Sequence, residues 1–214
     1  MIFWKQYDSH TVNILALSDR RVPYIYSPSV KETFKDVGLI VGCGDVSSDY
    51  LEYVVSQLCA PLIYVPGNHD ADDFRVPGGT PVDGKVIRTA GLTVAGLGGS
   101  QRYKKDGRHQ YSEREMHVRA LRLLPRLLLR RLAGGHRLDL LVTHAPPSGI
   151  HDAADLTHRG FLAFRRLLWF LRPRLMLHGH VHILPNLDRW ESSLYGVRIL
   201  NVYPVQNVQL ADRP

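Results

Sequence analysis

The stretch LIYVPGNHD, residues 62–70, decides the fold class of this chain. Its first four residues are apolar and have the length and character of a buried strand. The run ends at a proline and a glycine, and Asn68 and His69 follow directly. A strand that ends in side chains able to bind a metal or move a proton is typical of α/β proteins, in which ligands bind beyond the carboxyl ends of the strands.

The same arrangement recurs at four other places along the chain. An apolar run ends each time in a residue of a metal-binding type: Asp19 after 12–17, Asp45 after 39–42, His144 after 138–142, and His180 and His182 after 175–177. Because the carboxyl ends of parallel strands share one edge of a sheet, we expect these side chains to meet there. The alternation of His180 and His182 places both on one side of an extended segment. Imidazole, carboxylate and amide oxygen together suit a borderline divalent ion.

This set of motifs is similar to that of the calcineurin-like metallophosphoesterases, in the same order over residues 12–204. The motifs that carry the resemblance are Asp19, Gly44-Asp45, Gly67-Asn68-His69, His144 and Gly179-His180-Val181-His182. The resemblance implies a four-layer α/β/β/α sandwich of two mixed β-sheets flanked by helices. It also implies a metal-dependent phosphohydrolase, in which a metal-bound hydroxide attacks phosphorus.

The resemblance further implies a role for each site residue. Asp45 would bridge two metal ions, Asn68, His144 and His180 would complete one site, and Asp19 and His182 would hold the other. His69 would not be a ligand but would protonate the leaving group or stabilise charge on the phosphate, so His69 and Asp45 are the predicted catalytic residues. Asn68, His69 and Arg21 are the predicted substrate contacts. We expect manganese as the ion, with iron, zinc and nickel as alternatives.

Arg21 departs from the family pattern. The motif at the first strand end is Asp-x-His, and its histidine position is Arg21 here. Arginine has no lone pair to donate to a metal ion, so the site at Asp19 and His182 is expected to be the weaker one, with a hydrated ion or none. Arg21 itself either turns toward the phosphate or points to solvent or a nearby carboxylate.

Helical periodicity separates the strands. We predict helices over Ser48 to Leu58, from a capping box at Ser112 to Leu132, and from His158 to Leu171, all within a single domain of residues 1–214. Residues 190–204 are predicted to form short strands. Cys43 and Cys59 lie in apolar surroundings and are predicted to be buried thiols.

The net charge of +7 results from 27 Lys and Arg against 20 Asp and Glu. Much of the excess lies in 119–137 and 159–174, where arginines alternate with leucines, as on the solvated face of an amphipathic helix. No apolar run is long enough to span a membrane and no secretory signal is evident, so we expect a cytoplasmic protein with no membrane partner. A homo-oligomer is left open.

The leading hypothesis is a phosphodiesterase that acts on small diesters such as cyclic nucleotides. It rests on the small size of the chain and its similarity to compact bacterial phosphodiesterases. A nuclease or a phosphomonoesterase of the same fold is the alternative; nucleic acid is left open as a partner because of the positive charge, but is not favoured. A metal-poor scaffold protein is a further alternative, against which the complete ligand set argues. His178 is interpreted as structural, and His151, Arg102 and Tyr103 as neighbours of the substrate.

Overall fold

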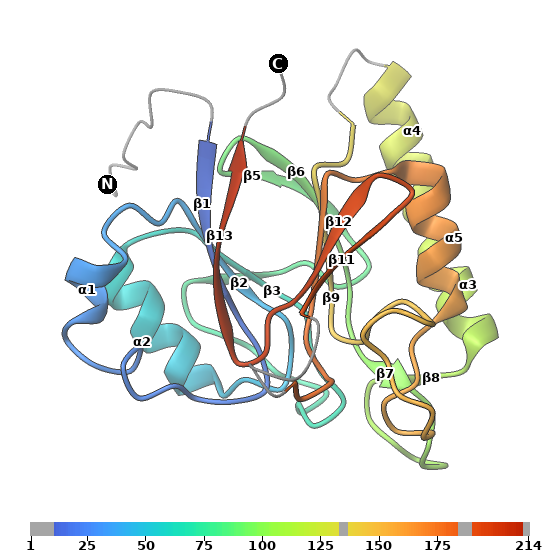
Figure 1. Ribbon diagram of the computed structural model, residues 1–214, viewed down its shortest axis with the longest axis horizontal. Helices are drawn as coiled ribbons and strands as arrows, with labels where there is room; N and C mark the ends of the chain where they lie inside the picture. Colours follow the sequence, from blue (N-terminus) through green and yellow to red (C-terminus); the bar gives the residue numbers. More distant parts are fainter. Residues whose placement is uncertain (1–10, 133–136, 184–189, 212–214) are drawn as a thin grey trace.

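The computed structural model describes residues 11–132, 137–183 and 190–211 (Figure 1). Two large mixed sheets pack face to face, and helices cover the outer face of each sheet. The predicted four-layer α/β/β/α arrangement is confirmed. Within the described ranges, no helix has the length and apolar character that crossing a membrane requires.

The first sheet has the strand order β13-β1-β2-β3-β4. Its strands are β1 (Thr11–Leu17), β2 (Leu39–Gly42), β3 (Leu62–Tyr64), β4 (Gly79–Pro81) and β13 (Val205–Ala211). Strands β1 to β4 are parallel, and β13 pairs with β1 in the antiparallel direction. Helices α1 (Val30–Thr33) and α2 (Ser48–Leu58) cover its outer face.

The second sheet has the strand order β11-β12-β10-β9-β6-β5. Its strands are β5 (Val86–Thr89), β6 (Leu92–Leu97), β9 (Leu140–Thr143), β10 (Leu175–His178), β11 (Glu191–Leu194) and β12 (Val197–Asn201). The four inner strands are parallel, and the two edge strands are antiparallel to their neighbours. Helices α3 (Glu113–Leu121), α4 (Leu124–Leu132) and α5 (Leu162–Leu171) cover this sheet, and β7 (Ser100–Gln101) pairs with β8 (Gln110–Tyr111) in a small separate ribbon.

Strands β2, β3, β6, β9 and β10 are buried along their whole length because both faces of each sheet are covered there. In β1, Ile14 and Ala16 belong to the core between the two sheets, whereas Leu15 and Leu17 pack with the residues of α1 and α2. This is the two-residue period of a strand applied to two different cores. The parallel strands of both sheets thus end at one edge of the sandwich, where their loops carry the polar residues.

The predicted single helix from Ser112 to Leu132 is wrong, because the chain forms two helices there. The capping box is present: the Ser112 hydroxyl accepts from the amide of Glu115, and the Glu115 carboxylate accepts from the Ser112 amide at 2.7 Å. Pro125 has no amide hydrogen and cannot continue a helix from the preceding turn, but it fits in the first turn of a new one. Helix α3 therefore ends at Leu121, and α4 begins at Leu124.

Two further expectations differ in detail from the structure. Helix α2 has the predicted bounds, but α5 begins at Leu162 and not at His158. Cys43 is buried as predicted, whereas Cys59 is exposed, and both thiols are free. Cys59 is the residue that terminates α2, with a left-handed φ of 51°, and this position turns the chain at the surface.

Candidate metal centre

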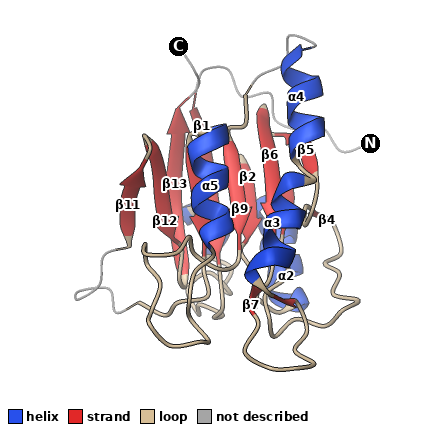
Figure 2. Cartoon of the chain, turned by 90° about the vertical axis from the view of Figure 1, so that its right-hand side faces the viewer, coloured by secondary structure: helices blue, strands red, loops and turns tan. Residues whose placement is uncertain are grey.

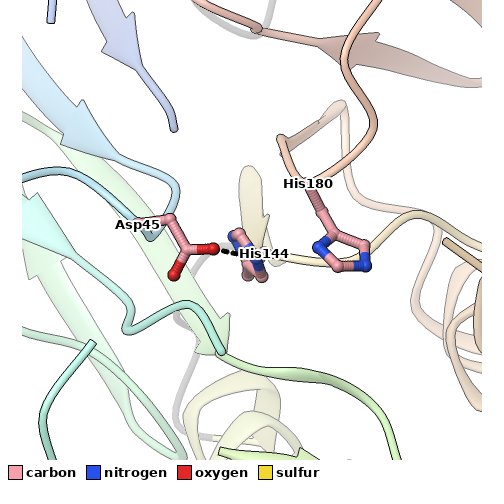
Figure 3. A group of neighbouring side chains, drawn as sticks. All are labelled: Asp45, His144 and His180. Atoms are coloured by element: carbon pink, nitrogen blue, oxygen red, sulfur yellow. Dashed lines mark ion pairs between the residues drawn. The ribbon is translucent and has the colours of Figure 1, made fainter. Parts of the chain in front are cut away.

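Three side chains from different strand ends converge at one edge of the sandwich (Figure 3). Asp45 follows β2 of the first sheet, His144 follows β9 of the second, and His180 follows β10. One potential ligand atom from each lies within 4.8 Å of the other two. The site therefore lies where the two sheets meet, with a carboxylate from one sheet and two imidazoles from the other.

Backbone carbonyls fix the orientation of both imidazoles. Nδ1 of His144 donates to the carbonyl of Cys43 at 2.7 Å, and Nε2 of His180 donates to the carbonyl of Thr157 at 2.7 Å. A carbonyl oxygen only accepts, so these nitrogens carry the hydrogens, and Nε2 of His144 and Nδ1 of His180 are left to bind a cation. Metal-binding histidines typically donate their second nitrogen in this way.

Asn68 completes the arrangement around His144. Nε2 of His144 lies 3.1 Å from Oδ1 of Asn68 and 3.3 Å from Oδ2 of Asp45. The Asn68 amide donates to the Tyr103 hydroxyl at 3.1 Å, which leaves its oxygen directed at the imidazole. Burial alone lowers the pKa of His144, but the charge of Asp45 raises it above its usual value. Two oxygens thus converge on a point that favours positive charge, which is supplied either by a proton on Nε2 of His144 or by a divalent ion that displaces this proton.

The charge states of the other two groups also fit a cation. Burial alone raises the pKa of Asp45, but the charge of His144 and their hydrogen bond lower it to about 2, so the carboxylate is ionised. Burial and the charge of His144 lower the pKa of His180 to about 4, so its imidazole is neutral near pH 7. An ionised carboxylate and a neutral imidazole are the forms that bind metal ions.

The backbone at this edge is held in a conformation that most residues avoid. Asp19, Asp45 and His180 have φ values of 61°, 54° and 67°, in the left-handed region. Such conformations cost about 1–3 kcal/mol each and cluster at functional sites. A Cβ at Gly67 would overlap the Asp45 carboxylate, and one at Gly179 would overlap the Ser18 hydroxyl. Close approach of the loops therefore requires glycine at both positions.

Asp70 joins two of the loops and supports the ligands without being one of the predicted ligands. Its Oδ2 accepts from the amide of Asp45 at 3.0 Å and from the amide of Gly67 at 2.7 Å. Burial raises its pKa above the usual value, although the two amides oppose this. Asp70 thus holds the loop after β2 against the loop after β3, and its place directly after Gly67-Asn68-His69 was the available signal.

Asp19 and His182 lie beside this group in a more open position. Oδ2 of Asp19 accepts from the amide of His180 at 3.0 Å, while Oδ1 lies 3.7 Å from Nε2 of His182. Burial alone raises the pKa of Asp19, but the hydrogen bond from His182 and the charge of His144 lower it. His182 stacks on the Tyr203 ring at 4.3 Å, with 62% of its side chain exposed. Even with Asp45 as the bridge that the family resemblance implies, this position has three candidate protein ligands, one fewer than the position at Asp45, Asn68, His144 and His180.

Arg21 lies against α2. Its guanidinium forms an ion pair with Asp49, donates to the Ser47 hydroxyl at 3.4 Å, and lies 4.3 Å from the centre of the Tyr26 ring. The structure thus shows the nearby-carboxylate alternative and not a contact with the metal group. Asp49 comes from a helix 28 residues further along the chain, so this pairing could not be read from the local sequence.

His69 presents its side chain at the surface of the site. Its amide donates to Oδ1 of Asp45 at 2.8 Å, which fixes the backbone while the imidazole remains exposed. His178, by contrast, is fully buried and lies 3.0 Å from Nδ1 of His151. Burial and the charge of His151 lower its pKa to about 3, so it is a neutral hydrogen-bonding residue outside the metal group.

Two mixed sheets in an α/β/β/α sandwich, with carboxylate, amide and imidazole groups at the strand ends, form a centre that could hold a divalent ion. The model of the calcineurin-like phosphoesterase family matches residues 30–184. The chain belongs to this family and is a metallophosphoesterase.

The individual proteins that resemble this chain share only a small part of its sequence. The uncharacterized protein MJ1162 of Methanocaldococcus jannaschii is 27% identical over 196 residues, which cover 78% of this chain and 79% of the relative. One solved structure superposes with a TM-score of 0.59 at 14% identity, covering 90% of each chain. The sulfate thiohydrolase SoxB of Thermus thermophilus, solved with glycerol, gives a TM-score of 0.43 at 14% identity, covering 83% of this chain and 36% of the other.

Replacing Arg21 by histidine is expected to strengthen the second metal position. Titration of Mn²⁺ into metal-free protein, followed by calorimetry, should show one tight site in the wild type. Arg21→His should tighten the second site about tenfold or more, because the imidazole adds a ligand beside Asp19 and His182. Arg20→His, one residue away and exposed, is the matched control and should leave the titration unchanged. Two equally tight sites in the wild type would contradict the prediction.

Proposed function

We propose that this metallophosphoesterase hydrolyses small phosphodiesters such as cyclic nucleotides, with manganese as the bound ion. The proposal rests on the difference between the two metal positions. The first position has four converging residues, Asp45, Asn68, His144 and His180. At the second position Arg21 is not a ligand, because its guanidinium is paired with Asp49. One strong cation position carries less positive charge than two. It suits a diester with a single negative charge better than a monoester with a charge of roughly −1.5 to −2.

Each residue of the site has a separate role in the proposed hydrolysis. A divalent ion bound at Asp45, His144 and His180 supplies a Lewis acid that polarises the phosphoryl group and lowers the pKa of water. Asn68, held by Tyr103, keeps its oxygen directed at the ion position. His69, whose backbone is fixed by Asp45, presents an exposed imidazole that gives a proton to the leaving oxygen.

A nuclease is the second candidate, and one observation favours it. The loop between β7 and β8 carries Arg102, Lys104, Lys105 and Arg108, and its Tyr103 contacts Asn68 of the site. Arg102 is paired with Glu115, whereas Lys104 and Lys105 are exposed next to Tyr103 in the chain, and they would attract a polynucleotide backbone. The size of the substrate therefore has to be tested together with its ester class.

The deciding experiment is a hydrolysis screen with manganese, iron, nickel, zinc and magnesium. Its substrates are bis-p-nitrophenyl phosphate, p-nitrophenyl phosphate, cyclic nucleotides and single-stranded oligonucleotides. We expect the diesters and cyclic nucleotides to have higher kcat/KM than the monoester, and manganese to give the highest activity. Preferred hydrolysis of the monoester would contradict the proposal. Cleavage of oligonucleotides that falls steeply with salt would replace it by the nuclease.

A further inference from the structure

The outer side of the helical layer over the second sheet exposes large apolar side chains. They are Leu121 at the end of α3, Leu128, Leu129 and Leu132 of α4, and Trp169 and Phe170 of α5, here called the helical face. Leu132 is 85% exposed, Leu129 66% and Trp169 59%. Single exposed apolar residues are normal, but several on adjacent helices indicate an interaction site.

The three helices that carry the helical face pack inward on one core. Leu127 of α4 and Phe164 and Leu168 of α5 are buried in the same hydrophobic cluster beneath the helices. The exposed positions of α4 and α5 are those that this core does not bury, and Figure 2 shows both helices in the layer nearest the viewer, in front of the second sheet. On α4, the spacing 128, 129 and 132 forms one stripe.

The charged side chains of α4 and α5 are all arginines. Helices α4 and α5 contain no aspartate or glutamate, and no acidic residue occurs in 116–138 or 156–187. Arg122 and Arg126 are exposed beside the leucines, and Arg166 and Arg172 are exposed beside Trp169. The solvated arginines predicted from the sequence are therefore present, but they border an apolar surface that is also exposed.

Although the sequence led us to expect no membrane partner, we propose that the helical face docks on the surface of an anionic lipid bilayer. Leucine, tryptophan and phenylalanine would enter the boundary between headgroups and acyl chains, which is the preferred depth of tryptophan. The arginines would contact the lipid phosphates at the level of the headgroups. Each helix lies on the surface, because neither is long enough to cross it.

The same charge pattern argues against a second copy of the chain as the occupant. Two helical faces packed together would bring unbalanced arginines opposite one another, which is unfavourable. An anionic bilayer instead supplies the opposite charge along with the apolar phase. This proposal is independent of the metal centre and of the choice between phosphodiester and nucleic acid.

The test is co-sedimentation of the full chain with vesicles. Phosphatidylcholine mixed with phosphatidylglycerol is compared with phosphatidylcholine alone, at low and high salt. We expect binding to the mixed vesicles only, a loss of binding at high salt, and a blue shift of tryptophan emission that Trp169→Phe removes. The double variant Trp169→Ser/Phe170→Ser should bind about tenfold or more weakly, because the buried apolar area provides much of the affinity.

Matched variants make the result specific to this surface. Tyr24→Ser removes an aromatic residue of similar exposure outside the helical face and should bind vesicles like the wild type. Arg126→Gln/Arg172→Gln should weaken binding and reduce its salt dependence. Circular dichroism confirms that each variant is folded.

The proposal is overturned by equal binding to neutral vesicles, by no binding, or by unchanged binding of the Trp169→Ser/Phe170→Ser variant. A concentration-dependent dimer without lipid binding, lost in the same variant, would assign the helical face to a second copy.

Discussion

Asp45→Asn is expected to abolish tight metal binding and to lower hydrolysis by about a thousandfold or more. The carboxylate is the one negatively charged group among the three whose ligand atoms lie within 4.8 Å, and it faces Nε2 of His144 at 3.3 Å. An amide of the same shape still accepts from the His69 amide but supplies no negative charge. Metal content measured by mass spectrometry and turnover of bis-p-nitrophenyl phosphate report the two losses separately.

Asp73→Asn is the control for this substitution. It makes the same chemical change at an exposed carboxylate outside the metal group, and we expect full metal content and activity. Thermal unfolding of both metal-free variants distinguishes loss of the ion from loss of the fold. Asp45→Asn protein that keeps both its metal and its turnover would show that the converging residues are not the metal centre.

The metal group was predictable because it depends on topology more than on detail. Each apolar run is a strand whose two faces are both buried, and parallel strands end at one edge. Asp45, His144 and His180 therefore meet although 135 residues separate the first from the last. The glycine at position 67 was also readable, because a tight approach to Asp45 leaves no room for a Cβ.

The parts that sequence reasoning missed depend on contacts between distant segments. Arg21 pairs with Asp49 of α2, and Tyr103 reaches Asn68 from the loop between β7 and β8. Neither Asp49 nor Tyr103 belongs to a periodic pattern or to a motif of fixed spacing that would identify its partner from the sequence. The break between α3 and α4 is a different case, since Pro125 is visible in the sequence and the capping box at Ser112 drew attention only to the start of the helix.

The helical face shows a limit of reading amphipathic patterns. Alternating arginine and leucine predicts a buried apolar side and a solvated basic side. Helix α4 does bury Leu127, but it also exposes Leu128, Leu129 and Leu132. A nine-residue helix with five leucines has more apolar side chains than its inner side can cover. Only the packing against the second sheet shows which of them remain outside.

His69→Ala is expected to lower kcat about a hundredfold or more while leaving metal content unchanged. The imidazole is exposed at the site, and only the backbone amide of His69 contacts Asp45, so the ligand arrangement should survive the substitution. If His69 gives a proton to the leaving oxygen, the loss of kcat in His69→Ala depends on how strongly the leaving group requires protonation. Steady-state turnover of a p-nitrophenyl diester and of a cyclic nucleotide measures this dependence.

The p-nitrophenyl diester should lose less activity than the cyclic nucleotide, because p-nitrophenolate leaves readily without a proton while a ribose oxygen does not. An equal loss for both substrates would instead assign His69 to stabilising charge on the phosphate. His117→Ala, on α3 and away from the strand ends, is the matched control and should retain wild-type turnover. Unchanged turnover of both substrates in His69→Ala would remove His69 from the reaction, and the proton for the leaving oxygen would then have to come from another group at the site.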